Sequence, residues 1–138
     1  MNWLVAGLIA GLAAYIADWV LWSRVIGAKG MEAFATPPAA GQPVNMGPLM
    51  LKSALLALAY GVVFAFVYRR FLGTLWTAPG VLGAMELATV MWLPLAFAST
   101  GCNVWFDRTR RLVSAQMWVW LIRMNAAAIV VGLFVRAI

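Results

Sequence analysis

The chain alternates four long apolar segments with shorter, more polar connections. The apolar segments cover residues 3–26, 49–71, 80–100 and 112–135. Each can cross a hydrocarbon core of about 30 Å at about 1.5 Å per helical residue. A transmembrane strand would need only about ten residues and would alternate in polarity. The pattern therefore predicts an all-α, polytopic membrane protein with four transmembrane helices in a bundle, as a single domain over residues 1–138.

The first connection differs from the other two in length and composition. Residues 27–48 contain Pro37, Pro38, Pro43 and Pro48 among several small residues. Proline and glycine interrupt regular structure, so we expect this loop to be irregular over most of its length. The other two connections are short and join neighbouring helices of the bundle.

The composition agrees with burial in lipid. Hydrophobic residues make up 65% of the chain and charged residues 10%, against about 45–50% and 25% in soluble domains. The net charge is +6, but the basic residues gather at the ends of apolar segments. That distribution is typical of membrane orientation and contact with anionic head groups. We therefore expect membrane lipids, and no nucleic acid, as partners.

Basic and aromatic residues predict how the helices sit in a membrane. Six basic residues fall on one side and three on the other, which favours a cytoplasmic location for the first and third loops and places both termini outside. The two groups are Arg24, Lys29, Lys52, Arg108, Arg110 and Arg111, against Arg69, Arg70 and Arg136. Six aromatic residues near helix ends are expected to anchor the interfaces: Trp3, Trp22, Tyr68, Trp76, Trp105 and Trp118. The predicted location is a bacterial cytoplasmic (inner) membrane, with several spans.

The chain has no histidine and a single cysteine, Cys102. An internal disulfide is therefore impossible, and so are haem or metal sites that need histidine ligands. Histidine is also the commonest general base. We predict no metal, cofactor or catalytic residue, although a bound lipid or pigment is compatible with the sequence. Cys102 is expected to be a buried or interfacial thiol.

Three ionisable residues lie inside apolar segments: Asp18, Glu86 and Arg123. A charge at this depth costs several kcal/mol unless it is paired or hydrated, so each is expected to face protein or water. Arg123 could reach either carboxylate. Two interpretations stay open: a relay for protons, ions or a substrate, and a structural ion pair that fixes the register of the helices.

Small residues mark the faces on which helices pack. Gly7, Gly11, Ala14 and Asp18 form one stripe of the first helix, and the Gly7–Gly11 spacing lets membrane helices approach closely. This stripe directs Asp18 into protein. Gly132 is a second candidate for helix packing, in the last helix.

The last helix carries two polar faces. Arg123 and Asn125 point about 200° apart on it, and neither face suits lipid. We therefore expect this helix to be surrounded within the bundle or shared with another subunit, as a homo-oligomer or within a larger complex.

Several local features are similar to small four-helix bacterial inner-membrane families of unknown function. They are the opening Met1–Leu4, the loop rich in glycine and proline, the run from Thr100 through Asn103 to Phe106 before a basic turn, and an acid four residues before a tryptophan, Asp18 and Trp22. The resemblance spans the chain and implies an architecture but no activity.

Three functions are compatible with this sequence. The first is a structural or accessory subunit of a larger membrane complex or oligomer, holding lipid or pigment. The second is a small transporter coupled to protons or cations, in which intramembrane carboxylates bind the ion. The third is a membrane enzyme acting on a lipid or quinone, which has the fewest suitable side chains.

Overall fold

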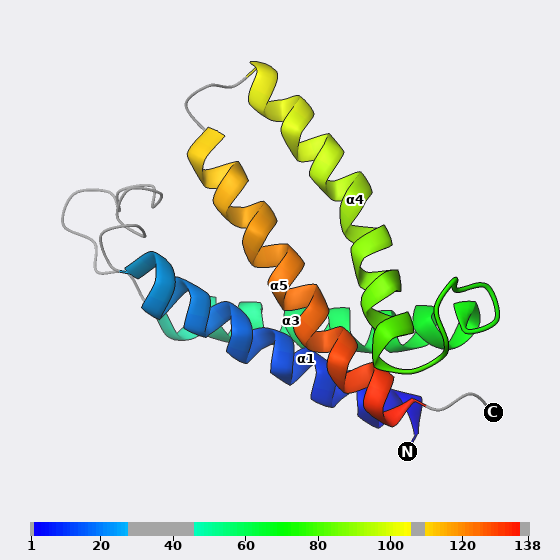
Figure 1. The fold of residues 1–138 in the computed structure, drawn as a ribbon. Helices are drawn as coiled ribbons and strands as arrows, with labels where there is room; N and C mark the ends of the chain where they lie inside the picture. The colour runs from blue at the N-terminus through cyan, green and yellow to red at the C-terminus, as the bar shows by residue number, and fades with distance from the viewer. Residues whose placement is uncertain (1, 28–45, 106–109, 136–138) are drawn as a thin grey trace.

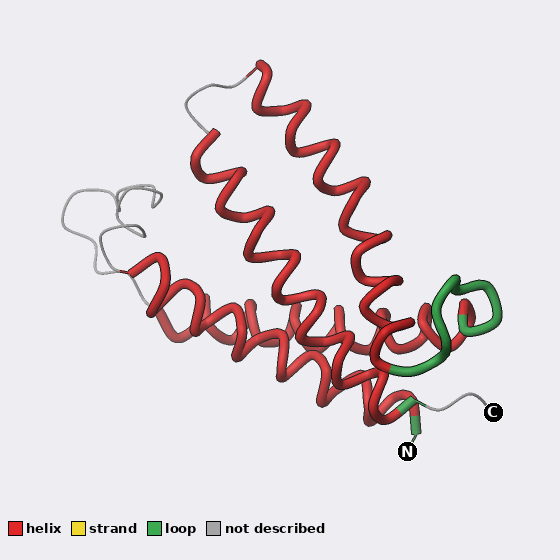
Figure 2. The backbone as a smooth tube through the Cα atoms, in the orientation of Figure 1, coloured by secondary structure: helices red, strands yellow, loops and turns green. Residues whose placement is uncertain are grey.

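The computed structural model describes residues 2–27, 46–105 and 110–135. These residues form four long helices and no strand (Figure 2). All four are long and apolar enough to cross a membrane, so the all-α prediction is confirmed and the chain is a multi-pass membrane protein. In chain order the elements are α1 (Trp3–Val20) with its π-helical continuation η1 (Leu21–Ile26), α3 (Met46–Phe71), α4 (Val81–Trp105) and α5 (Arg110–Phe134).

The helix ends differ in detail from the predicted segments. α3 begins at Met46 rather than at residue 49, and Pro48 lies in its first turn, where a helix does not need the missing N–H. α4 runs through Pro94 and ends at Trp105, beyond the predicted end at residue 100. Residues 101–105, which the sequence assigned to a connection, thus extend the helix. The predicted irregular loop falls mostly on residues 28–45, outside the described residues, as does the side chain of Cys102.

The helices form two antiparallel pairs that meet at one end. α1 packs along α3, α4 packs along α5, and the main contact between the pairs joins α1 to α5. Figure 1 shows the α4–α5 pair steeply inclined to the α1–α3 pair. The pairs are closest near the start of α1 and the end of α5, which lie on the same side of the molecule (Figure 1). The opposite end of the α4–α5 pair extends away from α1 and α3.

Glycine allows α1 and α3 to touch backbone to backbone. A Cβ atom on Gly11 would lie 2.6 Å from the carbonyl oxygen of Ala57 and from the Cα of Leu58. A Cβ on Gly61 would overlap the backbone of both Gly7 and Gly11. Membrane helices associate through such close packing, because lipid gives no hydrophobic force between them. Gly7 and Gly11 therefore set the distance between the two helices.

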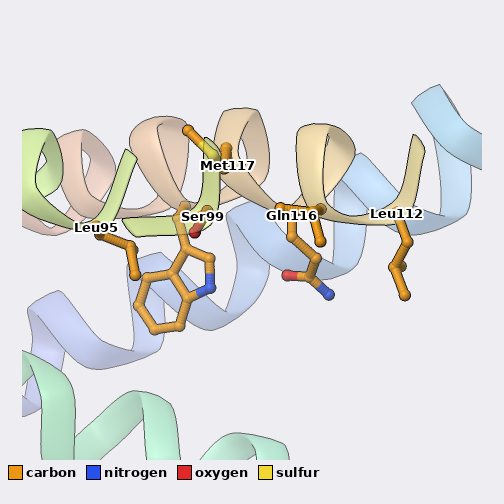
Figure 3. A pocket seen from close by; sticks show the side chains of 7 residues that line it. Leu95, Ser99, Leu112, Gln116 and Met117 are labelled. Carbon is orange, nitrogen blue, oxygen red and sulfur yellow. The ribbon is translucent and has the colours of Figure 1, made fainter. Parts of the chain in front are cut away.

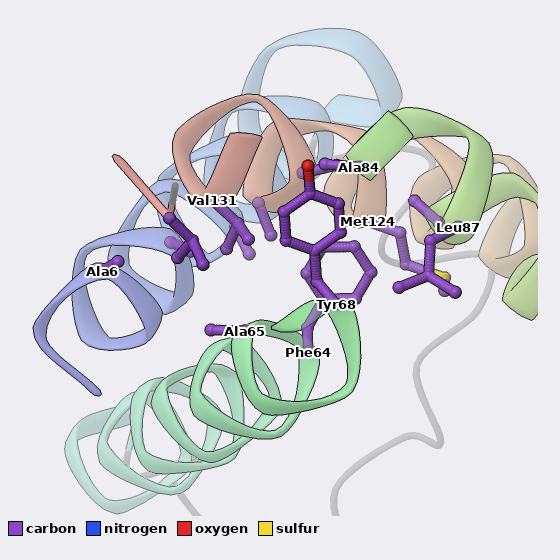
Figure 4. Packing of buried hydrophobic residues seen from close by; sticks show 14 residues of the cluster. Ala6, Phe64, Ala65, Tyr68, Ala84, Leu87, Met124 and Val131 are labelled. Atoms are coloured by element: carbon purple, nitrogen blue, oxygen red, sulfur yellow. The ribbon is translucent and has the colours of Figure 1, made fainter. Parts of the chain in front are cut away.

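Small and aromatic side chains fill the junction of the two pairs. Ala6, Phe64, Leu87 and Val131 lie in one buried cluster that draws on α1, α3, α4 and α5 (Figure 4). Alanines on α1 let the larger residues of α3 and α5 approach. Among the described residues, Tyr68, Phe64 and Val131 are the largest side chains that are fully buried.

Tyr68 was expected to anchor a membrane interface, and that prediction is wrong. Its side chain is fully buried. Its hydroxyl donates to the carbonyl oxygen of Gly80 at 2.9 Å and accepts from the N–H of Gly80 at 2.7 Å. Tyr68 therefore ties the end of α3 to the start of α4, because a buried hydroxyl needs hydrogen-bond partners.

The outer faces of the helices are strongly apolar. Large hydrophobic side chains on each of them remain half exposed or more, among them Leu12 and Ile16 on α1, Leu55 on α3, Phe97 on α4 and Leu133 on α5. In water this surface would be unfavourable, whereas lipid tails solvate it.

Candidate functional site

Asp18 and Arg123 meet between α1 and α5, within the depth that the helices span. The Asp18 Oδ2 and Arg123 Nη1 atoms are 3.9 Å apart. The Arg123 side chain is only 7% exposed and that of Asp18 17%. The structure thus brings together two of the three ionisable residues that the sequence singled out, and their charges cancel in a setting where an isolated charge would be costly. At 3.9 Å the two atoms are an ion pair, but they are too far apart for a hydrogen bond.

Two tryptophans complete the surroundings of this pair. The side chain of Trp22, one helical turn beyond Asp18, hydrogen-bonds to the carboxylate. The guanidinium carbon of Arg123 lies 4.6 Å from the ring centroid of Trp120. A cation over an indole face is attracted by about 2 kcal/mol when the contact is desolvated. Both charges are therefore held by aromatic partners as well as by each other.

Tyr60 brings α3 into the same group of residues. Its ring meets Trp120 edge-on with centroids 5.9 Å apart, and it stacks on Phe64 at 5.9 Å. We call Asp18, Tyr60, Trp120 and Arg123 the intramembrane polar cluster. It joins the helices α1, α3 and α5.

Three buried polar atoms of this cluster have no hydrogen-bond partner among the described residues. They are Nε and Nη2 of Arg123 and the hydroxyl of Tyr60. Buried polar groups are nearly always satisfied in proteins, and each exception calls for an explanation. The cluster is therefore the part of the described structure in which buried hydrogen-bonding groups remain unsatisfied.

A groove of about 270 Å³ lies between α4 and α5 beside the cluster. Trp120 belongs to both, so the groove ends where the cluster begins. In Figure 3 Gln116 and Leu112 point to the same side of α5, toward α1 and α3. Ser99 and Gln116 supply hydrogen-bonding groups in an otherwise mostly apolar wall. The α4–α5 groove is lined by Leu95, Ser99, Leu112, Val113, Gln116, Met117 and Trp120.

A second pocket of about 390 Å³ lies between α3, α4 and the turn that joins them. It is larger but mostly apolar, and its charged member is Glu86. The Glu86 carboxylate accepts hydrogen bonds from the backbone N–H groups of Trp76 and Thr77 at 2.8 Å each, and from the hydroxyl of Thr77 at 2.5 Å. Glu86 therefore fastens the turn, which leaves this pocket with no unpartnered charge.

The other predicted residues have local roles in the structure. Asn125 donates to the carbonyl oxygen of Leu121 in its own helix at 2.9 Å, so the second polar face of α5 is partly satisfied without a neighbour. A Cβ on Gly132 would lie 2.5 Å from the Cα of Val81, which places Gly132 against the start of α4. Ala14 is fully buried.

Sequence reasoning missed Tyr60 as a member of the cluster. A tyrosine in the middle of an apolar segment was the available signal, because its hydroxyl needs a partner there. Trp120 lies one turn before Arg123 on α5, and its contact with the guanidinium was not predicted. No group of three metal-ligating side chains occurs within the described part of the chain.

No protein-family model, curated protein or solved structure matches this chain. The resemblance to small bacterial membrane families therefore stays a prediction.

Proposed function

We propose that the protein is an accessory subunit of a bacterial inner membrane that holds a lipid-like molecule in the α4–α5 groove. The observation that carries this proposal is the position of the groove beside three unpartnered buried polar atoms, at a depth that lipid tails occupy. A groove with a few hydrogen-bonding groups in an apolar wall is the usual form of a site for small molecules.

The hydrogen bonds of several described polar side chains support a structural role for them rather than catalysis. Glu86 fastens a turn, Tyr68 ties α3 to α4, and Asn125 bonds its own helix. The indole N–H of Trp92 donates to the carbonyl oxygen of Met117 at 3.0 Å and joins α4 to α5. These bonds keep the helices in place, which is what an accessory subunit requires.

An exposed amide side chain on the groove wall supports membership of an oligomer or a larger complex. Gln116 lies within the α5 span and is exposed there. An exposed amide in lipid is unfavourable unless another molecule covers it. A bound molecule and a neighbouring helix can share this role, because both would cover the exposed Gln116 side chain.

Native mass spectrometry of protein extracted gently from its own membrane tests this proposal. We expect a lipid-like molecule to remain bound in stoichiometric amount. Ser99→Phe, which fills the groove, should release it. Thr100→Phe is the matched control, because Thr100 is the next residue of α4 and is not part of the groove wall. Equal retention of the same molecules by both variants and the unmodified chain would overturn the proposal.

A proton- or cation-coupled transporter is the second candidate. The 3.9 Å separation of Asp18 and Arg123 favours it, since a pair without a direct hydrogen bond can separate when the carboxylate takes up a proton or cation. In proteoliposomes with an imposed pH gradient, such a transporter would move protons or cations and Asp18→Asn would abolish the movement. The accessory role predicts no movement in either protein.

A further inference from the structure

We infer that the intramembrane polar cluster binds the neutral carbonyl oxygen of a membrane-soluble molecule, of the ketone or quinone type, whose head enters through the α4–α5 groove. This inference rests on the proposed function and names the chemistry of the molecule held. The donors are Nε–H and Nη2–H of Arg123 and the hydroxyl of Tyr60.

The free donors of Arg123 form one edge of its guanidinium group. Nη1 faces Asp18, while Nε and Nη2 have no partner. Nε–H and one Nη2–H bond run nearly parallel on the same edge, as a two-pronged fork in fixed geometry. A fork of this kind donates both of its hydrogen bonds to one acceptor oxygen atom. The side chain is 7% exposed, so bulk water does not satisfy it.

The charge of the cluster selects a neutral acceptor. Asp18 already balances Arg123, so a bound carboxylate or phosphate would leave one uncompensated negative charge within the bilayer. A charge at this depth weakens binding by roughly a hundredfold. A carbonyl oxygen satisfies the same fork with no change in net charge. The ligand is therefore a neutral molecule rather than an anionic lipid or a fatty-acid anion.

The depth of the cluster separates this ligand from ordinary phospholipids. Arg123 lies about 18 Å along α5 from Arg111, where the span begins, and Tyr60 about 15 Å along α3 from Met50. Arg123 is thus near the middle of the Arg111–Phe134 span and Tyr60 near the middle of the Met50–Phe71 span, and the middle of a spanning helix lies near the centre of the hydrocarbon core whatever its tilt. Ester carbonyls of phospholipids lie at the interface, so an acceptor at mid-depth belongs to a molecule that dissolves in the core.

The groove provides the route to this fork. Trp120 lines the groove and also covers the guanidinium, so it is the side chain that a ligand has to displace or stack against. A volume of about 270 Å³ is close to the lower end of ligand pockets, roughly 300 Å³. The groove therefore accepts a head group, and the remaining chain of the ligand lies in lipid.

Calorimetric titration in lipid nanodiscs tests the inference, with decylubiquinone as the neutral probe and laurate as the anionic one. We expect saturable binding of decylubiquinone with one site per chain, and binding of laurate at least tenfold weaker. Arg123→Lys keeps the charge but removes the fork, and should weaken decylubiquinone binding at least tenfold. Tyr60→Phe should weaken it about five- to tenfold, the value of one hydrogen bond.

Tyr60→Phe also distinguishes a loss of binding from a loss of folding. Its hydroxyl has no partner among the described residues, so the variant should unfold no more easily than the unmodified chain. Tyr15→Phe is the matched control, since Tyr15 lies on α1 outside the cluster, and should bind as the unmodified chain does. Unchanged decylubiquinone binding in both Arg123→Lys and Tyr60→Phe, or equal binding of laurate, would overturn the inference.

The two proposals fail in different ways. If Ser99→Phe releases a native molecule but decylubiquinone does not bind, the protein holds a ligand of another chemistry and the inference is wrong. If no native molecule is bound and no probe binds either, the proposed function fails together with it.

Discussion

Replacing Gly61 by alanine tests whether backbone contact sets the distance between α1 and α3. A Cβ at this position would overlap the backbone of Gly7 and Gly11, with the Gly11 Cα only 2.6 Å away. Ordinary contacts begin near 3.4 Å, so the helices have to separate by at least about 0.8 Å. The obstacle is backbone on the opposite helix, which cannot turn aside as a flexible side chain would.

The expected loss of stability follows from this separation. Overpacking of a rigid site costs about 1–3 kcal/mol, and a gap of 0.5–1 Å forfeits a quarter to a half of each dispersion contact along the interface. We therefore expect the upper value, about 3 kcal/mol. Alanine has a higher helix propensity than glycine by about 1 kcal/mol. The net decrease in the free energy of unfolding should be about 2 kcal/mol.

Steric trapping in bicelles measures this free energy for a membrane protein. Gly101→Ala is the matched control, because a Cβ on Gly101, also in a helix, meets nothing within 4 Å. It should leave stability unchanged or raise it by up to about 1 kcal/mol. If Gly61→Ala is as stable as Gly101→Ala, the backbones of α1 and α3 do not touch at Gly61.

Three further predictions concern the ion pair, the turn and the topology. Asp18→Leu should lower the free energy of unfolding by about 3–5 kcal/mol, because it leaves Arg123 buried without its partner. The double variant Asp18→Leu/Arg123→Met should recover most of this loss in the same unfolding assay. If the double variant recovers none of it, the pairing of Asp18 with Arg123 is contradicted. Glu86→Ala should speed hydrogen exchange of the Trp76 and Thr77 amides at least fivefold, because each loses its acceptor; unchanged exchange would show that Glu86 does not fasten the turn. Cysteines added at both termini should be labelled by an impermeant reagent in intact cells, in a chain without its native cysteine, and labelling only after permeabilisation would reverse the predicted orientation.

The sequence predicted the helices because hydrophobic length is a strong local signal. It placed Gly7, Gly11 and Asp18 on one face of α1, since a single helix fixes those directions. It could not predict which helix each face meets. That choice depends on how two helix pairs cross, and Gly61 and Tyr60 of α3 became partners only through that crossing.

The same limit applies to Glu86 and Arg123. Both appeared as isolated charges within apolar segments, and sequence spacing allowed either carboxylate to pair with Arg123. The structure places Arg123 beside Asp18, whereas Glu86 bonds the turn before its own helix. Helix boundaries were least predictable where a helix continues beyond the predicted apolar segment, as α4 does to Trp105.

An experimental structure of the protein in lipid nanodiscs prepared from its own membrane, at a resolution that shows the Arg123 guanidinium, tests the central claim most directly. We expect Nη1 to face Asp18 and the Nε–Nη2 edge to bond an oxygen atom of a bound neutral molecule that extends into the α4–α5 groove. A guanidinium whose nitrogens all bond to protein groups, beside a groove closed by side chains, would contradict the account.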